Sequence, residues 1–168
     1  MNCILPEKED FSGSDKNNSS SITKTLINDR FILLNKICSN SRFCEIYLCK
    51  DNITNDVVVL KILKKQFNSF VNNKSYKILK EGNILSQFSF NNIVSLIDNQ
   101  FKGTQKIYSK KNNNKIIKKE VTFLPIEFVP NGDLVSFLKL TEKGFREDIA
   151  IYLFKQIIEG INYLHNLN

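Results

Sequence analysis

The sequence lacks any long apolar run. Its longest uninterrupted apolar stretches are VVVL at 57–60 and IAIYLF at 149–154, whereas a membrane-spanning helix needs about 20 apolar residues. The start of the chain has one short apolar patch after Met1 and lacks the ordered charged and hydrophobic regions of a signal peptide. These absences predict an intracellular, cytoplasmic protein whose 168 residues suffice for one domain with a proper core.

Nitrogen and sulfur ligands for metals are scarce. The one histidine is His165, and the four cysteines are Cys3, Cys38, Cys44 and Cys49. The spacings between these residues match no zinc-binding pattern. We therefore expect free, reduced thiols and no metal site.

Acidic residues are absent from the segment KGTQKIYSKKNNNKIIKK, 102–119, which holds seven lysines and so equals the whole net charge of +7. A basic segment of this kind can bind nucleic acid or an anionic membrane. However, it has one aromatic residue, no arginine and a central NNN turn. We therefore favour a solvated loop or an extended hairpin, with no membrane partner, and keep nucleic-acid binding as the weaker alternative.

Periodic apolar patterning is missing from residues 1–28, which are rich in Ser, Asn, Lys and Asp and are predicted to be a disordered tail. Beyond the tail, β-branched and aromatic residues predict five short strands, and Ser75 is expected to cap a helix over 75–88. The strands are expected at 31–37, 43–50, 57–64, 93–101 and 121–129. Together they indicate an α+β fold, a five-stranded antiparallel sheet with one packed helix.

After PNGD, 130–133, the pattern becomes helical. A short helix capped by Asp133 and a long helix over 145–165 are expected. The long helix is apolar nearly all round, as a helix buried inside a larger body would be. The residues that form its main stripe are Ala150, Leu153, Phe154, Ile157, Ile161 and Leu164. An exposed apolar face here predicts self-association or a missing neighbouring lobe.

Two charged residues occupy positions that the apolar pattern assigns to the core. By strand alternation, Lys61 shares a face with Val57, Val59 and Leu63. Glu81 stands in the middle of the apolar stripe of the helix expected at 75–88. Because a buried unpaired charge is costly, the two side chains are predicted to pair, and a paired lysine can present a fixed cation to a phosphate. The alternative is that each side chain reaches solvent independently.

In this order, the motifs resemble those of the protein kinases. VVLK, 58–61, stands where the family has VAIK, and Glu81 stands where the family's helix glutamate pairs with that lysine. FNNIV, 90–94, is similar to the family's HPNIV stretch, and PIEFVPNGDL, 125–134, resembles the fifth strand and hinge. QIIEGINYLHNLN, 156–168, resembles the helix before the catalytic loop, most closely in the calcium/calmodulin-dependent Ser/Thr kinases.

The resemblance implies a kinase N-lobe over 29–129, with 102–119 as a basic insert between its fourth and fifth strands. The hinge and first two C-lobe helices then occupy 130–168. It implies ATP as cofactor, with Mg²⁺ in a complete relative, and a protein substrate as partner. Lys61 and Glu81 would position the phosphates as the catalytic pair. The implied nucleotide contacts are Ile37, Cys38, Ile46, Val59, Lys61, the gatekeeper Ile126, the backbone of Glu127 and Val129, and Asp133 at the ribose.

Two family features are missing. The turn CSNSRFC, 38–44, has no glycine where the family has GxGxxG, so its ability to cradle phosphate is in doubt. The family's catalytic loop, metal ligands and DFG motif would follow Asn168, so we expect an incomplete C-lobe, and these 168 residues alone are expected to be inactive. The favoured interpretation is the ATP-binding portion of a Ser/Thr protein kinase. The alternatives are a pseudokinase-like binding or scaffold module and a basic nucleic-acid-binding protein.

Overall fold

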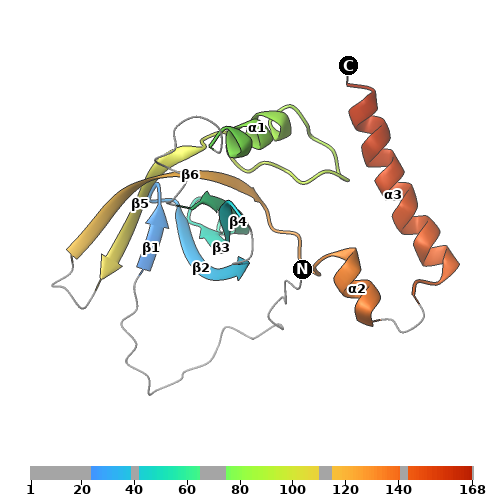
Figure 1. The fold of residues 1–168 in the computed structure, drawn as a ribbon, viewed down its shortest axis with the longest axis horizontal. Helices are drawn as coiled ribbons and strands as arrows, with labels where there is room; N and C mark the ends of the chain where they lie inside the picture. Colours follow the sequence, from blue (N-terminus) through green and yellow to red (C-terminus); the bar gives the residue numbers. More distant parts are fainter. Residues whose placement is uncertain (1–23, 39–41, 65–74, 110–114, 141–143, 168) are drawn as a thin grey trace.

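The computed structural model describes residues 24–38, 42–64, 75–109, 115–140 and 144–167. These residues form six strands and three helices (Figure 1). The strands are β1 (Lys24–Ile27), β2 (Phe31–Cys38), β3 (Cys44–Asp51), β4 (Val57–Leu63), β5 (Lys102–Ser109) and β6 (Lys115–Glu127). The helices are α1 (Ser75–Leu85), α2 (Leu134–Leu140) and α3 (Glu147–His165). The predicted α+β class is therefore confirmed.

The strands close into an antiparallel barrel in the order β1-β2-β3-β4-β6-β5. Strand alternation in β4 explains its interior, because Val58, Leu60 and Ile62 are buried at every second position. They pack in one core cluster with Phe31 and Phe123, whose rings meet edge to face at 6.1 Å between centroids. The opposite alternation, Val59, Lys61 and Leu63, therefore faces the outside of the barrel.

Helix α1 covers part of that outer face. Ile78 packs with Leu63 of β4 and Leu124 of β6 in a second core cluster. A glycine lies at the point of closest approach, since a Cβ on Gly82 would lie 2.6 Å from the Phe101 ring. Glycine is unfavourable inside a helix, and at Gly82 packing explains its presence, because it lets α1 lie close to the sheet.

The chain becomes ordered earlier than the sequence indicates. Residues 24–27, assigned above to the disordered tail, form β1, which pairs with both β2 and β5 and buries Leu26 and Ile27. A four-residue strand is too short to show periodicity, so its apolar pattern could not be separated from the polar tail before it. The rest of the predicted tail, 1–23, lies outside the described residues.

The strand expected at 93–101 is not present. This segment makes one isolated bridge, Leu96 to Ile126, and turns at Asp98, whose carboxylate accepts a hydrogen bond from the Gln100 N–H. The basic segment instead supplies a long hairpin, β5 with β6, paired from Lys102↔Thr122 to Ser109↔Lys115. The extended-hairpin interpretation is therefore correct, and the sheet has six described strands, not five.

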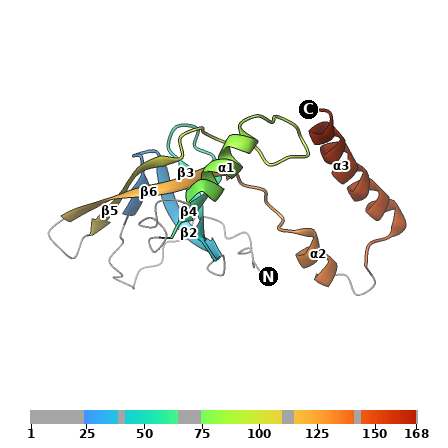
Figure 2. The same cartoon turned by 45° about the horizontal axis from the view of Figure 1, so that its top comes forward.

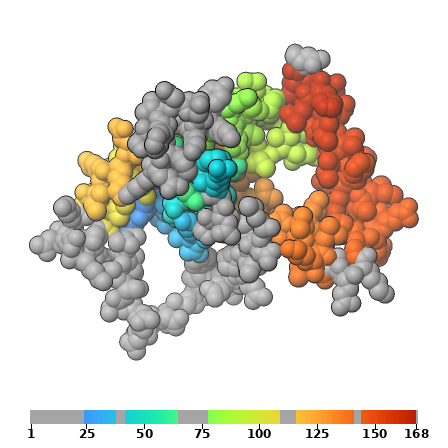
Figure 3. Space-filling model, in the orientation of Figure 1, coloured from blue at the N-terminus to red at the C-terminus, as the bar shows by residue number. Residues whose placement is uncertain are grey.

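Helices α2 and α3 lie apart from the barrel (Figures 1 and 2). Asp133 caps α2, since its carboxylate accepts a hydrogen bond from the Ser136 N–H at 2.6 Å. Much of the apolar surface of α3 is exposed, with Tyr152 at 66% and Phe154 at 62%; Figure 3 shows both helices in orange and red along one side of the molecule. In the part of the chain that the structure describes, no helix is both long and apolar enough to cross a membrane.

Candidate functional site

The Lys61–Glu81 ion pair is the centre of the candidate site. Strand β4 holds Lys61 between Ile46 of β3 and Leu124 of β6, and Glu81 lies one helical turn after Ile78 on α1. The Lys61 Nζ and Glu81 Oε1 atoms are 2.5 Å apart, which confirms the predicted pairing. Both side chains keep partial exposure, 28% for Lys61 and 42% for Glu81, so the pair lies at the surface of the core.

This arrangement fixes a cation on an apolar wall. A lysine ammonium carries three N–H donors, and Glu81 Oε1 occupies one of them. Because buried side chains anchor both β4 and α1, the position of the Lys61 ammonium is fixed. The N–H groups that do not bond Glu81 can donate to a ligand. An ammonium held in this way can bind the phosphate of a ligand.

A thiol beside the ion pair was missed by the sequence reasoning. Cys44 pairs across the sheet with Leu63 and packs against the cluster under α1. Burial raises the pKa of the Cys44 thiol, while the nearby Lys61 ammonium opposes that rise. The thiol is thus neutral at pH 7, so it does not compete with a phosphate for Lys61.

Three of the predicted adenine contacts lie on the same outer face of three adjacent strands. Ile46 lies opposite Lys61, and Val59 lies opposite Ile126, in adjacent cross-strand pairs on the outer face of the barrel. All three apolar residues are half-buried, so their remaining surface is available to a flat ligand. The predicted roof residue Ile37 is also half-buried and lies at an irregularity of β2, where the pairing with β3 shifts between Lys36 and Cys38.

The backbone register brings Cys38 opposite Ile46, at the entry to the glycine-free turn. Residues 39–41 of that turn lie outside the described residues, so the effect of the missing glycines on phosphate binding stays a prediction. On the far side of the turn, the Arg42 guanidinium lies 5.3 Å from the centre of the Phe43 ring.

The predicted hinge is only partly available for adenine. The Glu127 N–H donates to the Ser95 carbonyl at 3.0 Å, and the Glu127 carboxylate accepts from the Ser95 N–H at 2.8 Å. The carbonyl is therefore the backbone group of Glu127 that can meet an adenine. Val129 follows in an exposed, irregular segment, with 53% of its surface accessible.

The predicted ribose contact, Asp133, already has a structural role. Its hydrogen bond from the Ser136 backbone, at the start of α2, holds the pKa of the Asp133 carboxyl below its usual range. The carboxylate is therefore charged at neutral pH but committed to the helix cap. No contact among the described residues joins it to the Lys61–Glu81 pair.

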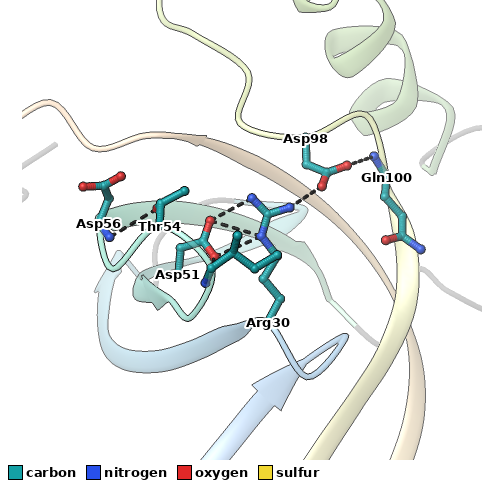
Figure 4. A network of polar contacts seen from close by, with 7 residues as sticks. Arg30, Asp51, Thr54, Asp56, Asp98 and Gln100 are labelled. Atoms are coloured by element: carbon teal, nitrogen blue, oxygen red, sulfur yellow. Dashed lines mark hydrogen bonds and ion pairs between the residues drawn. The ribbon is translucent and has the colours of Figure 1, made fainter.

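A buried charge network, also missed from the sequence, holds the opposite end of the barrel together (Figure 4). The Arg30 guanidinium donates to both carboxylate oxygens of Asp51, which is fully buried, and to the carboxylate of Asp98. These hydrogen bonds raise the pKa of Arg30 and lower that of Asp51. Because both acids stand at turns, where apolar periodicity is lost, no sequence signal linked them to Arg30.

The segment after α1 anchors α3. The Asn92 side-chain amide donates to the Gln156 carbonyl at 2.7 Å, and the Phe90 and Tyr163 rings stack at 4.5 Å between centroids. Gly160 permits this contact, because a Cβ there would lie 3.3 Å from the Asn92 carbonyl oxygen. The FNNIV motif thus joins the barrel to the C-terminal helix.

The described residues do not form a metal site. They include no group of three or more His, Cys, Asp or Glu side chains that could hold a metal ion. The described residues therefore offer no ligand set for the Mg²⁺ that the resemblance implies.

The comparisons with known proteins agree with this geometry. The family model described as "Protein kinase domain" matches residues 38–168. The chain is 23% identical to the probable serine/threonine-protein kinase fhkC of Dictyostelium discoideum, over 79% of this chain and 20% of that protein. It is 28% identical to myosin light chain kinase 3 of Rattus norvegicus, over 86% of this chain and 16% of that protein.

A solved structure shows the same fold. The crystal structure of Rad53 1–466 in complex with AMP-PNP superposes with a TM-score of 0.60 at 20% sequence identity. The match covers 82% of this chain and 31% of the Rad53 chain. The chain thus spans about a third or less of the proteins that it matches.

Proposed function

The chain belongs to the protein kinase family, and from that premise we propose that it forms the nucleotide-binding wall of a serine/threonine protein kinase. The observation that carries the proposal is the 2.5 Å ion pair between Lys61 and Glu81 beside an apolar surface. In this role the Lys61 ammonium holds an ATP phosphate, and Glu81 fixes the position of the ammonium.

The apolar surface supplies the second part of the site. Ile46, Val59 and Ile126 cover one face of the adenine, with Ile37 and Cys38 at the edge nearer the turn. The Glu127 carbonyl and the Val129 N–H meet the polar edge of the base. Asp133 reaches the ribose only if it gives up part of its cap on α2, which makes it the weakest of the proposed contacts.

The relatives support the finer parts of the proposal. Their names describe serine/threonine-protein kinases, so the longer protein's reaction is proposed to be transfer of a phosphoryl group from ATP to a protein serine or threonine. The match to a myosin light chain kinase supports a calcium/calmodulin-dependent-like subtype.

A binding module without catalysis is the second candidate. It is favoured by the glycine-free turn at 38–44. Such a module keeps the adenine surface but holds phosphates poorly. The two candidates therefore predict the same adenosine contacts and differ at Lys61.

Adenosine, which has no phosphates, tests the proposed surface directly. We expect it to shift the backbone amide signals of Val59, Ile126 and Val129 in a nitrogen-15 NMR titration, because the apolar contact and the hinge do not need Lys61. The amide of Lys50, exposed on β3, serves as an internal control. Shifts confined to other parts of the barrel would contradict the proposed adenine position.

A further inference from the structure

The barrel has a cavity away from the proposed nucleotide surface. It has a volume of about 520 Å³, within the range of sites that hold a ligand or a side chain of a partner. Its most buried lining residues are Ile62, Leu63 and Val121. Tyr47 and Ile107 extend the apolar lining. None of the residues that line it belongs to the proposed nucleotide surface.

Within the described part of the chain, a strand edge without a partner strand runs beside this cavity. Strand β4 pairs with β6 only as far as Ile62↔Phe123, whereas β6 continues to Lys115 with β5 on its other side. Among the described residues, no strand pairs with the remaining edge of β6 over 115–122. Figure 1 shows the β5–β6 hairpin, in yellow and orange, projecting beyond the other strands. A strand edge of this kind presents unpaired backbone N–H and C=O groups to an incoming chain.

The hairpin is strongly basic. Its two strands carry five lysines, and their two acidic residues are Glu120 and, at the last position of β6, Glu127. Lys106 is paired with Asp29, whereas Lys118 is exposed. Lys64 and Lys119 lie at the cavity together with Glu45, Gln105 and Glu120, whereas the strand edge over 115–122 carries three lysines and one acidic residue. The charge along the edge therefore suits an acidic partner.

Apolar residues on the same strand indicate more than a solvated hairpin. Ile116 and Ile117 point to opposite faces of β6 and are 46% and 40% exposed. Two adjacent exposed isoleucines next to a free edge favour strand pairing with another chain.

We propose that the edge of β6 over residues 115–122 docks an extended, acidic peptide segment of a partner protein. The segment adds a strand to the barrel by backbone hydrogen bonds and places an apolar side chain in the cavity beside Val121. Its acidic side chains, which alternate along the strand, meet the lysines of the hairpin. This combines backbone pairing for affinity with a pocket and charge for selectivity.

Other occupants of the edge fit less well. The same edge of a second copy would bring one lysine-rich strand against another, with like charges opposed. Single-stranded nucleic acid binds through stacked aromatic side chains and basic grooves, but the hairpin offers one aromatic residue, Tyr108, and no arginine. Neither occupant uses the apolar cavity.

The test uses a capped seven-residue peptide of alternating glutamate and isoleucine, flowed over the immobilised chain in a surface plasmon resonance experiment. We expect saturable binding that weakens with added salt. Lys118→Glu should weaken it about threefold or more, and Glu120→Lys should strengthen it by a similar factor. The matched control, Lys50→Glu at an exposed position of β3, should leave binding unchanged. Because a gain of affinity does not follow from misfolding, Glu120→Lys keeps the test decisive.

Three controls separate strand addition by a peptide from binding of nucleic acid or of a second copy of the chain. The same peptide with alternate amides N-methylated should not bind, and equal binding would overturn strand addition. A single-stranded DNA decamer that binds more tightly than the peptide, and depends on Lys118, would overturn the peptide as occupant. A dimer in light scattering that blocks the peptide and is strengthened in Lys118→Glu, which relieves the opposition of like charges, would assign the edge to a second copy instead. Because none of these measurements uses ATP or adenosine, their outcome does not depend on the proposed ATP site.

Discussion

At the residue scale, two ion pairs of similar appearance have different roles. Lys61 and Glu81 are both substantially exposed, so solvent screens their attraction and they add little stability. Arg30 instead pairs with Asp51, which is fully buried and accepts several hydrogen bonds. We therefore propose that the first pair serves ligand binding and that the second stabilises the fold.

Asp51→Asn tests the structural pair. Removing one partner leaves a mostly buried guanidinium without its main acceptor, so we expect a loss of about 3 kcal/mol in the free energy of unfolding, measured in urea. Asp98→Asn, the matched control on the same guanidinium, should cost less because Asp98 is 30% exposed. Equal losses for the two variants would contradict the conclusion that Asp51 contributes more stability than Asp98.

The same carboxyl predicts how stability depends on pH. The hydrogen bonds from Arg30 lower the folded-state pKa of Asp51. A lowered pKa contributes stability that is present above the unfolded value, near 3.9, and is lost as the pH falls towards the folded value. Urea midpoints between pH 7 and pH 3 should therefore fall less steeply for Asp51→Asn than for the unmodified chain.

At the element scale, the sequence predicted a helix or strand correctly where that element was long enough to show a periodic apolar pattern. The sequence predicted β2, β3, β4 and α1 because each is long enough for a repeating pattern of buried residues. It missed β1, which has four residues and is held by its neighbours. It wrongly placed a strand at 93–101, where β-branched residues are common. In this segment the Ser95 N–H donates to the Glu127 carboxylate and the Gln100 N–H donates to the Asp98 carboxylate, so neither N–H takes part in strand pairing.

The residues of the candidate site likewise divide into those that the sequence predicted and those that it did not. Lys61 on β4 and Glu81 on α1 were predictable, because a charge that interrupts an apolar pattern is visible in the sequence. The contacts of Arg30, Cys44 and Asn92 were not, since each joins segments far apart in the chain. The Glu127 N–H could not be assigned either, because its bond to Ser95 depends on how an irregular segment folds.

The closure of the barrel by β1 gives a prediction at this scale. Asn28, at φ 52°, accepts a hydrogen bond from the Thr104 N–H through its side chain. A Cβ on Gly103 would lie 1.9 Å from the Asn28 Oδ1 atom. Gly103→Ala should therefore displace β1, with a loss of about 1–3 kcal/mol, seen as faster hydrogen exchange at Leu26 and Ile27.

A double variant provides the control. Asn28→Gly removes the clashing side chain and suits the positive φ, so it should recover part of the stability lost in Gly103→Ala. Exchange rates at Leu26 and Ile27 that are unchanged by Gly103→Ala would show that β1 does not depend on this contact.

At the scale of the whole molecule, α2 and α3 expose a large apolar surface. The exposed apolar residues of α3 include Ile151, Tyr152, Phe154, Ile158 and Ile161. Contiguous apolar surface promotes association, so we expect the purified chain to self-associate as its concentration rises, measured by light scattering. Phe154→Lys should reduce the apparent mass, whereas Lys155→Ala, on the next residue, should not. A monomer at high concentration would contradict this.

The central claim is that Lys61 and its apolar surface bind a nucleotide, and an ATP titration followed by NMR tests it most directly. Immobilising the ligand costs at least about 4 kcal/mol, and the described residues cover only one face of the adenine. We therefore expect a dissociation constant for ATP weaker than about 1 mM, with little effect of Mg²⁺. Lys61→Met should remove the part of the ATP affinity that comes from its phosphates, whereas Lys50→Met should not. Micromolar, Mg²⁺-dependent binding, or ATP binding unchanged in Lys61→Met, would contradict the account.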